Sequence, residues 1–244
     1  MALQGRPVHR RIGGRRGGAL MASAKIFFDV YDAELQLADI LRAFDTSEEG
    51  LAAAPDREAK YIDAVLSDHP DAERNEIRRH LVNEAFSEIE RSRQTICQAF
   101  VLSNFSTFEF GLLRITENYL TAANSNFVLK DFAGHGYEKF LIVANKLAAA
   151  NLINKESWDC VPSYCLVRNQ IAHNGGMCTN IEERNKIEKA LKTLGNSGLN
   201  EVPEQDMWSI EIEPRFVKKM NARMTVLLRS AHETLEGILD HANP

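Results

Sequence analysis

Cysteines and long apolar runs are both scarce in this sequence, and each scarcity excludes a class of protein. The 244 residues contain four cysteines with no secretory signal ahead of them. This predicts reduced thiols in a cytoplasmic protein rather than a disulfide framework. No stretch of roughly 18 to 20 uncharged apolar residues occurs, so we expect no membrane span and no membrane partner.

The usual sequence signals of cofactor-dependent and hydrolytic enzymes are missing as well. There is no Gly-x-Gly-x-x-Gly, no Gly-x4-Gly-Lys-Ser/Thr, no Gly-x-Ser-x-Gly and no His-Glu-x-x-His. These motifs mark dinucleotide sites, P-loops, α/β-hydrolases and zinc proteases. We therefore expect no bound cofactor.

The candidate ligands for a zinc site, Cys160, Cys165, His173 and Cys178, have unusual spacings along the chain. Helical residues five apart point about 140° away from each other, and zinc ligands are usually spaced by two to four residues. Because a buried cysteine is the commoner state, we expect no metal.

The first 22 residues differ in composition from the rest of the chain. Five arginines stand among glycines there, without the apolar run that a secretory signal requires. We expect a disordered basic extension over 1–22, with Met1 or Met21 as the start; a nucleic-acid-binding arm and an organelle presequence are the alternatives. Without these five positive charges the formal charge of −5 becomes −10, which argues against a broad basic face for long nucleic acid.

Apolar residues recur at steps of three and four along most of the chain, as in amphipathic helices. The pattern predicts helices over 23–44, 56–69, 71–123, 139–150, 155–174, 180–194 and 214–241. Residues 45–55 are small, acidic and marked by Gly and Pro, which predicts a linker. The helix 71–123 is either continuous or broken near Ser103 and Asn104, and 208–212 alternates like a short strand.

Helices joined by short loops bury their apolar stripes against one another, so we expect an all-α protein built as a helical bundle. We divide the chain into the extension 1–22, an additional N-terminal helical region over 23–70, and a main helical domain over 71–244.

Three hydrogen-bonding side chains lie close together near the end of the predicted helix 155–174. Asn169 and His173 are four residues apart and share one face of the helix. Arg168 starts about 140° away from His173, an angle that its side chain only partly closes. Arg168 and His173 can approach each other more closely if they come from two copies of the chain that meet in a dimer.

The run Arg168-Asn169-x-x-x-His173, followed by Gly175-Gly176, resembles the signature of the HEPN superfamily (higher eukaryotes and prokaryotes nucleotide-binding). The apolar segment 105–113 and the stretch 210–217 also look like parts of its bacterial members. The resemblance covers about residues 80 to 240. It implies an HEPN-like helical bundle, a homodimer whose two motifs face one cleft and, in active members, a metal-independent endoribonuclease acting on RNA in phage defence, toxin–antitoxin systems or stress responses.

The residue types suit that chemistry, with Arg168 and His173 as the catalytic pair. His173 would take the proton of the ribose 2′-hydroxyl or protonate the departing 5′-oxygen, and Arg168 would stabilise charge on the phosphoryl oxygens. The products would be a 2′,3′-cyclic phosphate and a 5′-hydroxyl. Asn169 would orient the imidazole or the phosphate. Glu109 either pairs with Arg168 and holds it in place or points into solvent.

Two other functions are consistent with the same residues. One is a non-catalytic dimeric binding or regulatory module, in which Arg168 and His173 only form a salt bridge or cap a helix. The other is a substrate partner of a nucleotidyltransferase. An antitoxin or nucleotidyltransferase encoded nearby would favour these partnered roles.

Overall fold

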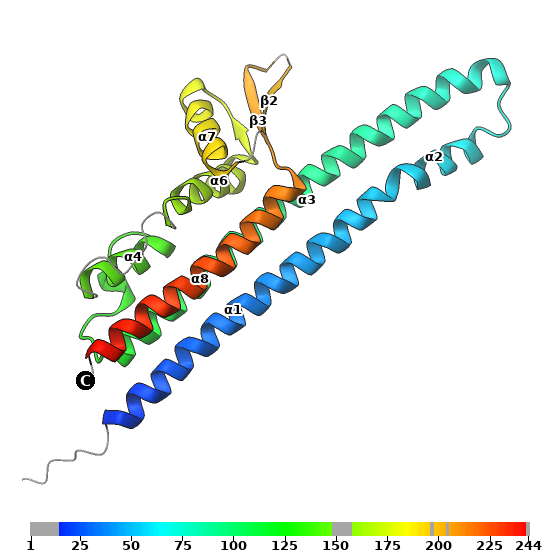
Figure 1. Cartoon of the computed structure of the whole chain (residues 1–244). Coiled ribbons are helices and arrows are strands. Elements are labelled where there is room, and N and C mark those ends of the chain that lie inside the picture. The colour runs from blue at the N-terminus through cyan, green and yellow to red at the C-terminus, as the bar shows by residue number, and fades with distance from the viewer. Residues whose placement is uncertain (1–14, 148–157, 196–197, 204, 243–244) are drawn as a thin grey trace, which may run out of the picture. The chain divides into compact units, whose positions relative to one another are not determined.

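The computed structural model describes residues 15–147, 158–195, 198–203 and 205–242, which form helices and one small sheet (Figure 1). The helices are α1 (Arg15–Ala52), α2 (Ala54–Val65), α3 (Asp71–Ala122), the 3-10 turn η1 (Leu129–Asp131), α4 (Gly136–Leu147), α6 (Val161–Asn174), α7 (Ile181–Leu194) and α8 (Pro214–Ala242). The strands are β1 (Met177–Cys178), β2 (Gly198–Val202) and β3 (Met207–Glu211). The predominantly helical class expected from the sequence is confirmed.

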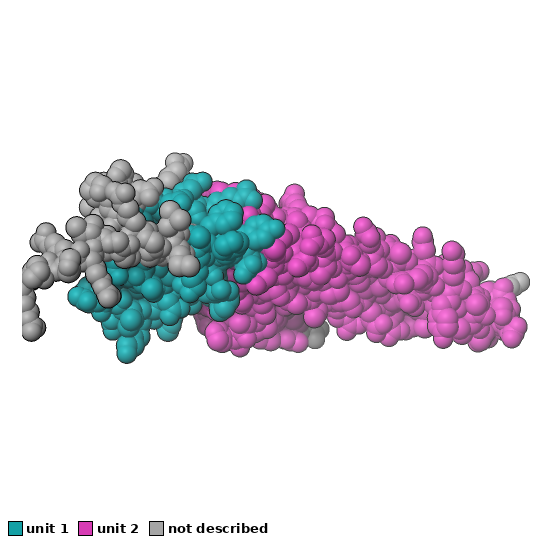
Figure 2. Space-filling view, turned by 90° about the horizontal axis from the view of Figure 1, so that it is seen from below, with its two compact units in different colours: residues 1–32, 109–153, 228–244 teal, residues 33–108, 154–227 magenta. Residues whose placement is uncertain are grey.

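The chain divides into two compact units, which Figure 2 colours separately. Unit 1 consists of Met1–Asp32, Glu109–Ile153 and Leu228–Pro244, and unit 2 of Ala33–Phe108 and Asn154–Leu227. Helices α1, α3 and α8 each contribute to both units. The boundary expected between residues 70 and 71 stays a prediction.

In unit 2, α1, α3 and α8 pack against one another through aromatic rings and a buried amide pair. The rings of Phe44 and Phe100 are 5.1 Å apart between centroids. The Asn221 side chain on α8 donates to Asn104 Oδ1 on α3 at 2.7 Å and to the Leu37 carbonyl on α1 at 2.8 Å. Because all three helices share these contacts, the amide pair fixes their relative register.

In unit 1, a buried carboxylate joins α1 to α3. Asp29 is 3% exposed, forms an ion pair with Arg114 at 2.6 Å, and accepts a hydrogen bond from Asn118. Phe140 and Val143 of α4 are fully buried in the apolar core of the same unit. A buried carboxylate needs such partners, because its desolvation is otherwise costly.

Helix α1 differs from the sequence prediction at both ends. It begins at Arg15 rather than Ser23, so the expected disordered extension is helical from that residue on. It also runs through the expected linker 45–55 to Ala52, and Pro55 lies in the first turn of α2. The linker prediction is wrong because Phe44 is buried and Asp45 pairs with Lys218 at 2.7 Å, contacts that hold this part of α1 helical.

Helix α3 is continuous, so the alternative of a break near Ser103 and Asn104 is wrong. The Ser103 hydroxyl donates to the Ala99 carbonyl at 3.0 Å, one turn earlier, and Asn104 is fully buried. The Ser103 hydroxyl is therefore bonded inside the helix, and Asn104 Oδ1 accepts from Asn221 on α8, so neither residue ends the helix.

The three-stranded sheet has the order β1-β3-β2, and both pairs are antiparallel. The extended segment expected at 208–212 is confirmed as β3, which lies in the middle. Its buried Ile210 lies opposite Leu199 of β2. Strands β1 and β2 were not predicted, since neither short segment alternates polar and apolar residues clearly.

Among the described helices, α3 is long and apolar enough to cross a membrane by length and composition alone, over Glu73–Ala122. In its most apolar 18-residue window, 39% of the residues are buried. The core helix of a soluble protein passes the same test, so the expected absence of a membrane partner stays a prediction. The residues predicted helical over 148–150 and 155–157, and the extension over 1–14, lie outside the described residues.

Candidate functional site

Helix α6 carries the Arg168–His173 segment and ends in the predicted left-handed cap. Gly175 has φ 59° and Gly176 has φ 78°, and the N–H groups of both glycines donate to the Gln170 carbonyl. Only glycine adopts such backbone angles without a steric penalty. The cap ends the helix directly after His173 and Asn174.

The residues after the cap tie the end of α6 to the sheet and to α3. The Gly176 carbonyl accepts from the Ile210 N–H at 2.9 Å, and the Gln170 side chain donates to the Met177 carbonyl. A Cβ atom at Gly176 would lie 2.8 Å from Gln98 Nε2 on α3, so the backbone approaches that helix closely. These contacts hold the last turn of α6 in a defined position.

The Arg168 side chain is half-buried and held from two sides. Its Nη1 donates to Asn169 Oδ1 at 2.8 Å, and its guanidinium carbon lies 5.0 Å from the centroid of the Phe105 ring on α3. Phe105 is fully buried, so this cation–π contact is partly shielded from water. The guanidinium therefore has a restricted position.

His173 lies in the exposed last turn of α6, and the structure records no hydrogen bond or ion pair between it and any described residue. Asn169 bonds to Arg168 and, at 3.6 Å, to Cys165 Sγ rather than to the imidazole. Within one chain, the structure does not bring Arg168 and His173 into hydrogen-bonding contact. Convergence of these two side chains across a dimer remains a prediction.

Glu109 lies in unit 1 on α3 and is half-buried. A Cβ atom at Gly136, whose φ is 43°, would collide with the Glu109 carboxyl group. The carboxylate thus lies against the first residue of α4. Arg168 belongs to unit 2, so the expected pair between Glu109 and Arg168 also remains a prediction.

The four cysteines are all free thiols. Cys97 and Cys178 are buried, and burial raises the pKa of both, that of Cys97 to about 12. These two are neutral thiols at physiological pH, whereas Cys160 and Cys165 are half-buried. No group of three or more metal-ligating side chains occurs within the described ranges.

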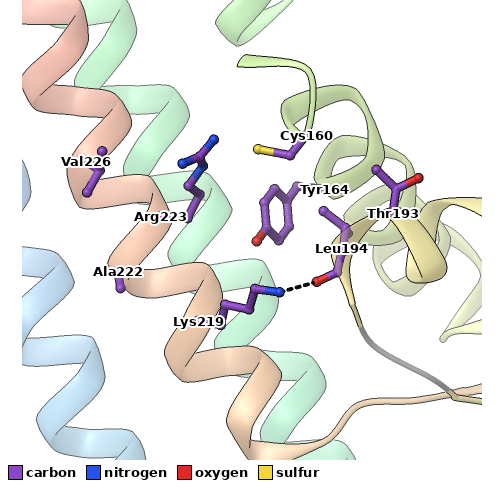
Figure 3. Close-up of a pocket in the computed structure, with 8 residues that line it drawn as sticks. All are labelled: Cys160, Tyr164, Thr193, Leu194, Lys219, Ala222, Arg223 and Val226. Carbon is purple, nitrogen blue, oxygen red and sulfur yellow. Dashed lines mark hydrogen bonds between the residues drawn. The ribbon is translucent and has the colours of Figure 1, made fainter. Parts of the chain in front are cut away.

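The structure also shows a pocket of about 390 Å³ that sequence reasoning missed (Figure 3). It lies in unit 2 and is lined by residues of α6, α7 and α8 and by the residue preceding α6: Cys160, Tyr164, Thr193, Leu194, Lys219, Ala222, Arg223 and Val226. The available signal was the pair Lys219 and Arg223, which are four residues apart and share one face of the last predicted helix. The other lining residues come together only in the folded chain.

Comparison of the chain with protein-family models, with curated proteins and with solved structures gives no match. No relative therefore supplies a function for it.

Proposed function

We propose that this protein is a metal-independent endoribonuclease of the HEPN type, with Arg168 and His173 as its catalytic residues. The observation that carries the proposal is an exposed His173, held at the capped end of α6, on the same helix as an Arg168 with restricted mobility. Proton transfer needs an accessible imidazole, and charge stabilisation needs a positioned cation. The HEPN-like arrangement of the bundle and an RNA substrate in the cytoplasm are part of this proposal.

The reaction uses one proton acceptor, one proton donor and one cation. His173 accepts the proton of the ribose 2′-hydroxyl, whose oxygen then forms a bond to phosphorus. The bond from phosphorus to the 5′-oxygen breaks, and that oxygen takes up a proton from the second His173 of a homodimer. Arg168 stabilises the charge on the phosphoryl oxygens. The products carry a 2′,3′-cyclic phosphate and a 5′-hydroxyl.

Asn169 and Glu109 have supporting roles in this proposal. Because the Asn169 amide accepts from the guanidinium, its role is to hold Arg168 rather than the imidazole. The pairing of Glu109 with Arg168 is tested with Glu109→Gln, by measuring RNA cleavage and the melting temperature together. A carboxylate paired with Arg168 predicts a loss in both measurements, whereas a carboxylate that does not contact Arg168 predicts no change in cleavage.

The test of catalysis is incubation of the purified protein with total RNA and tRNA in excess chelator. We expect the wild type to cleave with cyclic-phosphate ends, and His173→Ala and Arg168→Ala to be slower by at least about 100-fold. His80→Ala, which removes an exposed histidine on α3, is the matched control and should keep full activity. Equal cleavage by His173→Ala and His80→Ala would contradict the assignment.

Mixing the two inactive variants tests whether the pair converges in a dimer. A mixed dimer of His173→Ala and Arg168→Ala retains in a shared cleft one arginine and one histidine, which still accepts the 2′-hydroxyl proton, while water protonates the 5′-oxygen in place of the second histidine. We expect the refolded mixture to cleave RNA faster than either variant alone. If native mass spectrometry shows mixed dimers without recovered cleavage, the shared cleft is ruled out.

The second candidate is a non-catalytic dimeric binding or regulatory module, including a partner of an antitoxin or a nucleotidyltransferase. It is favoured by the contacts that Arg168 already makes with Phe105 and Asn169 inside one chain. A folded, dimeric wild type that binds RNA or a partner without cleaving RNA would support it. Under this alternative, Arg168→Met lowers the melting temperature, while His173→Ala does not.

A further inference from the structure

The pocket beside α6 has the size of a small-molecule site and is separate from the exposed end of that helix. Its volume of about 390 Å³ lies within the range of roughly 300 to 1,000 Å³ that is usual for ligand pockets. Tyr164 lies near the start of α6, whereas His173 lies at its end. The pocket is therefore not part of the proposed cleavage site and would serve a different purpose.

Positive charge dominates the ionisable side chains of the pocket. Lys219 and Arg223 lie one turn apart on α8, and no carboxylate is among the described residues that line the pocket. The Lys219 ammonium donates to the Leu194 carbonyl at 2.9 Å, which uses one of its three N–H groups. The neighbouring Lys218 pairs with Asp45 on α1. Arg223 has an interaction of its own, and the five N–H groups of a guanidinium leave donors for a ligand. The pocket thus favours an anion.

The hydroxyl of a largely buried tyrosine points into the same space. Tyr164 is 2% exposed, and its hydroxyl bonds to none of the described residues. Figure 3 shows this hydroxyl pointing toward the Lys219 side chain. Burial raises the pKa of Tyr164 to about 12, so the hydroxyl remains a neutral donor. The hydroxyl therefore keeps its donor for a ligand acceptor in the pocket.

The rest of the lining is largely apolar. Leu194, Ala222 and Val226 line the pocket together with the ring of Tyr164, and Val226 is 52% exposed to solvent. An apolar group of a ligand would cover this surface. The ligand therefore combines an anionic end with an apolar body.

We propose that this pocket binds a small phosphate monoester with an apolar body, held by Lys219, Arg223 and the Tyr164 hydroxyl. A phosphate monoester carries nearly two negative charges and three acceptor oxygens, which match two cations and one hydroxyl donor. A carboxylate has one charge and two oxygens and would leave part of this set unused. The proposal does not depend on ribonuclease activity.

The test is calorimetric titration of the full chain with phenyl phosphate, and with inorganic phosphate and benzoate as comparison ligands. We expect phenyl phosphate to saturate one site per chain and to bind more tightly than either comparison ligand. Lys219→Met should weaken its binding by about 10-fold, and Tyr164→Phe by about 5-fold. Lys218→Met removes the same charge one residue away and should leave the affinity unchanged.

Tyr164→Phe keeps the ring contact with Phe216, whose centroid lies 5.9 Å away, so the variant should fold; its melting curve checks this. Three results would overturn the proposal: no saturable binding of phenyl phosphate, equal weakening by Lys218→Met and Lys219→Met, or an unchanged affinity in Tyr164→Phe. Benzoate binding as tightly as phenyl phosphate would overturn the assignment of a phosphate.

Discussion

Replacement of Asn221 by leucine should strongly destabilise unit 2, although the two side chains have similar volumes. Asn221 is 4% exposed, and its amide group donates two hydrogen bonds, to Asn104 Oδ1 and to the Leu37 carbonyl. Leucine fills a similar volume but donates nothing. The variant therefore removes both bonds that connect α8 to α3 and α1.

The magnitude follows from the groups left behind. Each lost hydrogen bond costs about 1 kcal/mol, and the unsatisfied oxygen of fully buried Asn104 costs a further 1 to 3 kcal/mol or so. We expect Asn221→Leu to lower the free energy of unfolding by about 3 to 5 kcal/mol. Asn104→Leu should cost only about 1 to 2 kcal/mol, because Asn221 keeps its bond to Leu37.

The double variant Asn104→Leu/Asn221→Leu should cost less than the sum of the two single variants, by about 2 to 4 kcal/mol, because the sum counts the shared hydrogen bond twice and includes the unsatisfied oxygen. With both amides replaced, no Asn104 oxygen is left unsatisfied, and the two leucines contact each other. Urea unfolding of all four proteins measures this coupling, with exposed Asn185→Leu on α7 as a control expected within about 0.5 kcal/mol of wild type. Additive losses, or a larger loss in Asn104→Leu than in Asn221→Leu, would refute the reasoning.

Three further predictions concern backbone strain, a buried ion pair and a buried thiol. Gly176→Ala should lower stability by about 1 to 2 kcal/mol, because φ is 78° and the new Cβ meets Gln98 Nε2 at 2.8 Å; adding Gln98→Ala should recover part of the loss in thermal unfolding. Asp29→Ala should cost about 1 to 3 kcal/mol in urea unfolding, because buried Asn118 loses its acceptor, whereas Arg114 is 40% exposed and can be solvated. The pKa of Cys97 is raised from 9.0 to about 12, so the stability from its neutral thiol is complete below pH 9 and is lost between pH 9 and 12. Unfolding free energies measured across that range should decline less steeply in Cys97→Ala.

Helix ends were predicted well where a local signal specifies them. Gly175 ends α6 in a left-handed cap, and Asn180 begins α7 by accepting from the Glu183 N–H at 2.9 Å. Pro214 begins α8, as expected. These signals act over a few residues, so the sequence alone contains them.

Predictions failed where distant contacts outweigh local composition. Residues 45–55 are rich in small and acidic residues, yet α1 continues to Ala52 because Phe44 packs on Phe100 and Lys218 pairs with Asp45. Strands β1 and β2 were missed for a related reason. Each is short, and its pairing with β3 supplies the hydrogen bonds that make it a strand.

In the candidate site, too, local features were predicted from the sequence and contacts between distant residues were not. The sequence alone predicted the helix that carries Arg168, Asn169 and His173. It also predicted that Asn169 and His173 share one face of that helix, and that a glycine cap ends the helix. Only the tertiary structure decided that Arg168 lies over Phe105, that Asn169 holds Arg168, and that Tyr164 and Lys219 line one pocket. Periodicity reports which residues share a face of one helix, whereas contacts between helices depend on how distant segments pack.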